Sequence, residues 1–287
     1  MSSSSALSYA IASQKVTIYF GIAVLISGVI GNLLNIIVFR SLKTFRQNSC
    51  VFYLTVMALV NINQLISGLF SRIMIVGFNI DWTQSSAFYC KFRPYSLIVS
   101  ALISFTCMCL ATIDQYLATC LRVRWQRWNK IKVAHIVTSI SVLIWMLYGI
   151  PYLIYNNLLY LPSINRKMCL GSTTKFYYFY AYTFIWVLGG VLPIIINALF
   201  GLLAYWNVQQ LHRRILPLVR QELDKQLTVI VLVQVVYSFV AIIPYVIVTI
   251  IVVDSVVTND ALWQAKLQLA TTIATCFYYL NFSVSFR

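Results

Sequence analysis

The chain has 287 residues, of which 61% are hydrophobic and only 9% are charged, and 21 Lys and Arg against 6 Asp and Glu give a net charge of +15. Soluble domains carry about 45–50% apolar and about 25% charged residues, so this composition excludes a soluble globular protein, a disordered chain and a coiled coil. The basic residues do not alternate with aromatic residues on a polar surface, so we expect no nucleic-acid partner. Multi-span membrane proteins gather such residues in their inner loops.

Seven apolar runs follow a short polar start, Met1–Gln14. Each run exceeds the roughly 18 residues that indicate a membrane-spanning helix. Backbone groups in lipid must be satisfied within their own segment, so we expect helices. The predicted helices are 16–39, 51–71, 94–121, 133–155, 176–206, 227–253 and 265–287. The predicted fold class is therefore an all-α membrane protein, a seven-transmembrane helix bundle that forms a single domain over 1–287.

The charges of the loops predict the orientation of the bundle. The connections after the first, third and fifth runs carry twelve Lys and Arg residues, whereas the opposite side carries eight together with Asp81, Asp254 and Asp260. Basic loops remain on the cytoplasmic side. We therefore expect a multi-pass protein of the plasma membrane with its N-terminus outside and its C-terminus in the cytoplasm.

Five of the seven cysteines lie in or at the edge of the apolar runs, and two do not. Cys90 comes just before the third run, and Cys169 lies in the loop between the fourth and fifth runs. Both fall on the predicted outer side, where the environment is oxidising. We expect a Cys90–Cys169 disulfide that ties this loop to the third helix. The other five cysteines are interpreted as small apolar residues, and no metal site is expected.

Several short motifs occur one to a helix, in order along the chain. They are Gly31-Asn32 in the first run, Trp82 before Cys90, Asp114-Gln115-Tyr116 at the end of the third, Trp145 and Pro151 in the fourth, Pro193 in the fifth and Pro244-Tyr245 in the sixth. Together with the cysteine pair, this pattern resembles the rhodopsin-like (class A) G protein-coupled receptors. The resemblance covers nearly the whole chain. Its overall character is similar to divergent invertebrate neuropeptide receptors of the FMRFamide-like type, or to chemosensory receptors.

The resemblance implies roles for particular residues. Asp114, Gln115, Tyr116 and Asp224 are the candidates for G protein coupling, and Pro193 and Pro244 are candidate helix hinges. Gln115 replaces the Arg of the family's Asp-Arg-Tyr, so it can offer Asp224 a neutral hydrogen bond but no ion pair. We expect a looser resting state, weak coupling, or both.

Other positions also depart from the family pattern. The helix-six Trp is Ile242 and the helix-two Asp is Asn61, so we expect no bound sodium ion beside Ser104. The helix-seven motif should begin at Ser285, two residues before the end of the sequence. We expect a truncated gene model in preference to a receptor with unusual ending chemistry. The sequon at Asn281 lies inside the seventh helix and is not expected to be glycosylated.

The candidate ligand pocket consists of Leu97, Tyr245, Thr275 and Tyr279, with Arg166 and Lys167 of the outer loop nearby. Leu97 occupies the position at which amine receptors carry a carboxylate, and Tyr279 occupies that of the opsin Schiff-base Lys, so neither ligand class is expected. The apolar and aromatic lining favours an extracellular peptide or small-molecule ligand of apolar character.

The predicted function is therefore a receptor that binds such a ligand and activates a heterotrimeric G protein, with membrane lipids as further partners. No catalytic motif is present, His135 and His212 are isolated, and neither an enzyme activity nor a cofactor is expected. A decoy or truncated receptor that binds ligand without coupling is the main alternative. A polytopic transporter is weaker, because no internal repeat relates the two halves of the chain.

Overall fold

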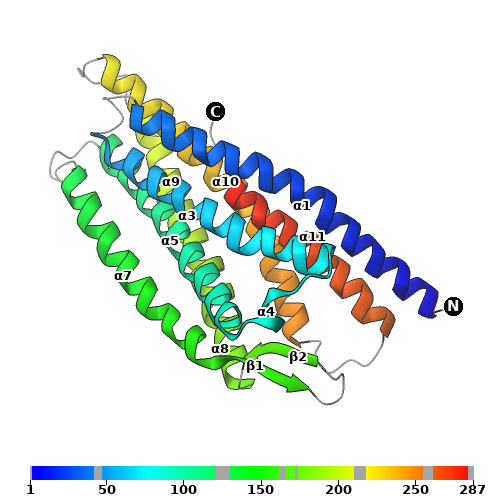
Figure 1. Cartoon of the computed structure of the whole chain (residues 1–287). Helices are drawn as coiled ribbons and strands as arrows, with labels where there is room; N and C mark the ends of the chain where they lie inside the picture. The colour runs from blue at the N-terminus through cyan, green and yellow to red at the C-terminus, as the bar shows by residue number, and fades with distance from the viewer. Residues whose placement is uncertain are drawn as a thin grey trace.

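The computed structural model describes residues 2–41, 47–120, 130–161, 166–171, 174–209, 218–254 and 261–283. They form a bundle of seven long helical segments with one small hairpin at one end (Figure 1). The N-terminus lies at the same end as the hairpin and α4, and the C-terminus lies at the other end. We call these the hairpin end and the Asp114 end, after a residue described below.

The first three segments begin and end differently from the predicted runs. The first is α1 (Ser2–Ser41), the second joins α3 (Ser49–Gln64), η1 (Leu65–Phe70) and η2 (Ile73–Gly77), and the third is α5 (Ala87–Thr119). Caps explain two of these starts: the Asn48 side chain accepts a hydrogen bond from the Cys50 amide at 2.9 Å, and Ser86 accepts one from the Tyr89 amide at 3.3 Å. Hydropathy missed the first turns of α5 because Lys91 and Arg93 interrupt the apolar pattern.

The remaining segments complete the bundle. The fourth is α7 (Ile131–Tyr155), the fifth joins α8 (Thr174–Phe179), η3 (Tyr180–Val191) and α9 (Leu192–Gln209), the sixth is α10 (Leu218–Asp254) and the seventh is α11 (Ala261–Ser283). Among the described residues, six segments are long and apolar enough to cross a membrane, and α11 is not one of them. The polar residues of its first turns lower its hydropathy. The observed bundle nevertheless confirms the predicted seven-helix, all-α class.

The polar start of the chain is helical and not an irregular segment. Two contacts hold it against the bundle: the buried Ser13 and Thr272 hydroxyls lie 2.7 Å apart, and the half-buried Gln14 side chain donates to the Gly77 carbonyl at 2.7 Å. Over its length α1 packs on α11 and on the second segment. Tertiary contact therefore extends a helix that hydropathy alone begins at residue 16.

The third helix forms the centre of the bundle. α5 packs against α3, α7, α9 and α10, and it is the most buried of the membrane-spanning helices. α7 lies on the outside and is the least buried. The core has two apolar clusters along the axis of the bundle, one around Leu102 and Phe282 towards the hairpin end and the other around Leu54 and Val231 towards the Asp114 end.

The loop after α7 forms an antiparallel hairpin that the sequence did not predict. β1 (Asn156–Leu161) pairs with β2 (Arg166–Gly171), with Leu158 opposite Cys169. Neither strand alternates apolar and polar residues, so no period-two signal was present to indicate it.

Candidate functional site

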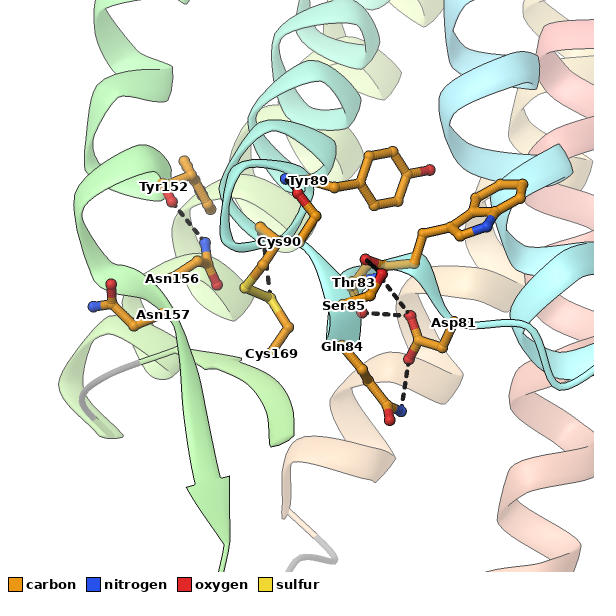
Figure 2. Close-up of a disulfide and its surroundings, with 12 residues drawn as sticks. Asp81, Thr83, Gln84, Ser85, Tyr89, Cys90, Tyr152, Asn156, Asn157 and Cys169 are labelled. Atoms are coloured by element: carbon orange, nitrogen blue, oxygen red, sulfur yellow. Dashed lines mark hydrogen bonds between the residues drawn. A yellow bond between two sulfur atoms is a disulfide. The ribbon is translucent and has the colours of Figure 1, made fainter. Parts of the chain in front are cut away.

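A disulfide joins the hairpin to the central helix (Figure 2). Cys90 lies in the first turns of α5, Cys169 lies in β2, and their Cα atoms are 5.6 Å apart. The predicted pairing is confirmed. The bond fixes the hairpin over the end of the bundle at which α5 begins.

The segment beside the disulfide is also held firmly. Asp81 caps the short helix α4 (Trp82–Ser85): its carboxylate accepts from the Thr83 amide and from the Gln84 side chain, both at 2.9 Å (Figure 2). The Trp82 ring meets the Tyr89 ring edge-on at a centroid distance of 6.2 Å. These contacts set the path of the chain between the second helix and α5.

A cavity of about 580 Å³ opens at the hairpin end between the second helix, α10 and α11. It is lined by Arg72, Val76, Val252, Gln264, Ala265, Leu267, Gln268, Thr271 and Thr272. Arg72 is its one cationic lining residue among those described, and its Nη2 donates to the Thr272 hydroxyl at 3.5 Å. The volume falls within the ~300–1,000 Å³ that is usual for small-molecule sites.

The residues predicted to form the ligand pocket lie deeper than this cavity. Leu97 and Tyr279 meet over Gly68, where a Cβ atom would lie 2.6 Å from both the Leu97 Cδ2 and the Tyr279 hydroxyl oxygen. Tyr245 stacks on Tyr278 at 4.4 Å, and the Thr275 hydroxyl donates to the carbonyl of Thr271 in its own helix at 2.6 Å.

These pocket candidates leave little open space. Tyr245 borders a void of only about 10 Å³, close to the smallest volume that holds one water molecule. None of Leu97, Tyr245, Thr275 and Tyr279 lines the larger cavity. Lys167 is exposed on β2, and the side chain of Arg166 lies outside the described part of the chain.

Sequence reasoning missed Arg72 as a site residue. It took this arginine as the end of the second helix, whereas the helix continues to Gly77 and carries the guanidinium inside the bundle. The available signal was a cation followed by six further residues without a polar side chain, 73–78, before the polar turn at Asn79. An ionisable group at such a depth is a functional candidate by default.

Buried polar side chains form hydrogen bonds between helices through the middle of the bundle. Ser104 donates to Asn61 at 2.6 Å, and Ser238 donates to Asn281 at 2.6 Å. Nearer the hairpin end, Ser100 donates to Gln64 at 2.7 Å. These bonds join the second helix to α5 and α10 to α11, since a polar group in an apolar interior needs a partner.

At the opposite end, three consecutive residues of α5 contact three different helices. Asp114, which is 5% exposed, accepts from the Ser49 hydroxyl of α3 with both carboxylate oxygens, at 2.9 and 3.0 Å. Gln115 is buried, and its side-chain oxygen accepts from the Thr228 hydroxyl of α10 at 3.1 Å. The Tyr116 ring packs on Phe200 of α9 at 5.5 Å.

Thr228, which bonds to Gln115, lies one helical turn after Asp224, the residue that the sequence suggested as a partner of Gln115. Asp224 falls within α10, and its side chain is outside the described residues. The Thr228–Gln115 bond joins two neutral side chains. The predicted bond between Gln115 and Asp224 stays a prediction. Ser285, the predicted start of the helix-seven motif, also lies outside the described residues.

The two proline positions differ in their surroundings. Pro193 is buried at the start of α9, directly after the π-helical turns of η3, and Asn197 one turn later accepts from Thr112 of α5 at 2.9 Å. Pro244 lies inside α10, which is helical on both sides of it. Both residues lack an amide donor and so weaken the backbone ladder of their helices.

Within the described ranges, no group of three or more His, Cys, Asp and Glu could hold a metal ion. A comparison with curated proteins returned no match. The profile of the family described as "7 transmembrane receptor (rhodopsin family)" matches residues 31–284. This match covers most of the chain and agrees with the bundle, the disulfide and the order of the motifs. The chain therefore belongs to the rhodopsin family of seven-transmembrane receptors.

Proposed function

We propose that this receptor binds an extracellular peptide or small apolar ligand at its hairpin end and activates a heterotrimeric G protein at its Asp114 end. The disulfide supports an outer location for the hairpin end, because such bonds persist in oxidising compartments. The basic connections at the other end support a cytoplasmic location there, with the C-terminus inside. The membrane is the plasma membrane.

The observation that carries the proposal is the contact of Asp114, Gln115 and Tyr116 with α3, α10 and α9. The Gln115–Thr228 bond is the link in this set to α10, the helix that contains Pro244. A ligand shifts a two-state equilibrium by binding one state better than the other. In the proposed mechanism, agonist favours a state in which α10 pivots near Pro244 and this bond opens.

Opening the bundle beside residues 114–116 creates room for a helix of the G protein α-subunit. The bond that opens is neutral, and a neutral hydrogen bond contributes only about 0.5–1.5 kcal/mol. The proposed resting state is therefore held less firmly than one closed by an ion pair. This predicts measurable activity without ligand.

The experiment is a G protein dissociation assay without ligand in cells, normalised to surface expression. Thr228→Val removes the hydroxyl that bridges to Gln115 and should raise basal activation about two- to ten-fold. Thr249→Val is the matched control on the same helix, since among the described residues the Thr249 hydroxyl bonds only to its own helix, at the Tyr245 carbonyl at 2.7 Å. Equal basal activity in the two variants would contradict the mechanism.

Ligand binding without coupling is the second candidate, and the uncharged Gln115 favours it. Gln115→Arg places a guanidinium beside Asp114 and restores the family's charged pair. Both chains are tested against a peptide and small-molecule library. If the native chain is well expressed but silent, and the Gln115→Arg variant responds, the result supports the non-signalling receptor. Activation of the native chain would support coupling.

A further inference from the structure

We propose that the 580 Å³ cavity at the hairpin end binds the carboxylate of a ligand with an apolar body, and that Arg72 holds this carboxylate. The inference deepens the proposed function, because it gives the chemical class of the ligand, and it rests on that function only in treating the bound molecule as an agonist. Binding itself can be tested without any signalling.

The guanidinium of Arg72 has donors that meet no acceptor among the described residues. An arginine carries five N–H donors. Of these, one reaches the Thr272 hydroxyl at the long distance of 3.5 Å, and Nε is buried without a hydrogen-bond partner. Thr272 is itself 2.7 Å from Ser13, so its hydroxyl is shared. A buried donor without an acceptor is costly, and a bound acceptor removes that cost.

The charge of Arg72 is also uncompensated within the described part of the chain. No acidic residue is among the described residues that line the cavity. Arg93 of α5 has a buried Nε without a partner as well, and both arginines lie within electrostatic range of the Tyr279 hydroxyl. Two half-buried cations thus act on the same hydroxyl, and no carboxylate is among the described residues that line the cavity beside Arg72. A buried charge is stable only when it is paired, so this end of the bundle favours an anion.

The rest of the lining fits a carboxylate with an apolar body. Gln264, Gln268 and Thr271 supply further polar groups from α11, while Val76, Val252 and Leu267 supply apolar surface. The planar fork of a guanidinium matches the two oxygens of a carboxylate. Such a head group is found both on fatty acids from the bilayer and at the free C-terminus of a peptide.

The backbone around Arg72 is unusual in a way that agrees with a site. The π-helical turns η1 and η2 lie directly before and after Ser71 and Arg72. Widened turns of this kind shift the register of a helix face and occur often at functional sites. Here they accompany a cation that faces the interior of an apolar bundle.

The experiment measures thiol modification in the full chain in lipid nanodiscs. A single cysteine is introduced at Gln268→Cys, which lines the cavity, and the unmodified chain gives the background. We expect the anionic reagent MTSES to react several-fold faster than the cationic MTSET. Arg72→Gln should abolish this preference. Lys266→Gln, a charge change in α11 at a residue that does not line the cavity, should leave it intact.

A second arm tests binding by protection of this cysteine. Decanoate is compared with decanamide, and the tripeptide Phe-Leu-Phe with its C-terminal amide. We expect an acid to protect at a concentration at least about ten-fold lower than its amide, the effect of one charge-assisted hydrogen bond. Protection by decanoate assigns a lipid source, protection by the peptide acid assigns a peptide source, and either supports the proposal.

Arg72→Lys keeps the experiment decisive if Arg72→Gln folds poorly. The lysine variant retains the positive charge but lacks the planar guanidinium. The preference for MTSES should therefore remain, while protection by the acids weakens. Absence of any anionic preference in the Gln268→Cys chain, or equal protection by acids and amides, would overturn the proposal. The effect of Thr228→Val on basal signalling would survive that outcome, so the two failures are distinguishable.

Discussion

Gly28 of α1 faces the backbone of Ser283 in α11: a Cβ atom on Gly28 would lie 2.7 Å from the Cβ atom and 2.9 Å from the Cα atom of Ser283. One turn along α1, the Asn32 side chain donates to the Phe282 carbonyl at 2.9 Å. Close approach at a small residue and an adjacent hydrogen bond are the means by which helices associate in lipid. The first and last helices are joined at this point.

Gly28→Ala should therefore push α1 and α11 apart. Overpacking of this kind costs about 1–3 kcal/mol, so we expect a lower melting temperature of the purified receptor in detergent. Gly201→Ala is the control, because its Cβ would meet only side-chain atoms, of which the Leu232 Cδ2 is nearest at 3.2 Å. Equal melting temperatures for the two variants would show that the α1–α11 contact has room to adjust.

Ser49→Ala should destabilise the Asp114 end. The Ser49 hydroxyl donates to a buried carboxylate, and loss of such a charged hydrogen bond costs about 1–3 kcal/mol. Ser141→Ala serves as the matched control, because the one bond of this hydroxyl within the described part of the chain stays inside α7, to the Val137 carbonyl at 2.8 Å. We expect the melting temperature to fall for Ser49→Ala alone. If the melting temperature fell equally in Ser141→Ala, the hydrogen bond between α3 and α5 would contribute no more to stability than a hydrogen bond within one helix.

Cys90→Ala and Cys169→Ala should reduce stability to the same extent, and the double variant should be no worse than either. The disulfide closes a long loop, with a sequence separation of 79, and such crosslinks contribute about 2–4 kcal/mol. The measurements are the melting temperature and the number of free thiols after denaturation without reductant. If the losses of stability in the two single variants added up in the double variant, the disulfide would not be the source of the effect.

The sequon at Asn281 should remain unglycosylated. Asn281 is 4% exposed, lies inside α11, and its side-chain oxygen accepts from Ser238 at 2.6 Å. A glycan there has no room and no access to the transferase. We expect no shift in gel mobility after treatment of the expressed receptor with a peptide N-glycosidase. A shift that disappears in Asn281→Gln would refute this placement of the seventh helix.

Local features of the sequence were sufficient for the helices and for the disulfide. A run of apolar residues long enough to cross a bilayer has few alternatives to a helix. Cys90 and Cys169 were identifiable because the other five cysteines lie in or at the edge of such runs. The Asp114-Gln115-Tyr116 segment was identified by its resemblance to the family's Asp-Arg-Tyr motif at the end of the third helix.

Features that depend on contacts between distant residues could not be predicted in this way. The helical start of α1 depends on Ser13 meeting Thr272, 259 residues away. The partner of Gln115 is Thr228, and no spacing rule selects that hydroxyl. The hydropathy pattern placed the end of the second helix at Arg72. The cavity that this residue lines forms only when the helices pack together. Local patterns determine where helices form, while their side-chain partners follow from how the helices pack.

The length of α1 has a consequence for ligand exchange. At a rise of 1.5 Å per residue, its 40 residues extend about 60 Å, twice the roughly 30 Å thickness of the hydrocarbon layer. Residues 2–14 are thus part of a stiff rod, braced by Gln14 and Ser13, and not a flexible tail able to fold across the cavity. Association at Arg72 would then be limited by diffusion and steered by charge, and its rate should fall as ionic strength rises.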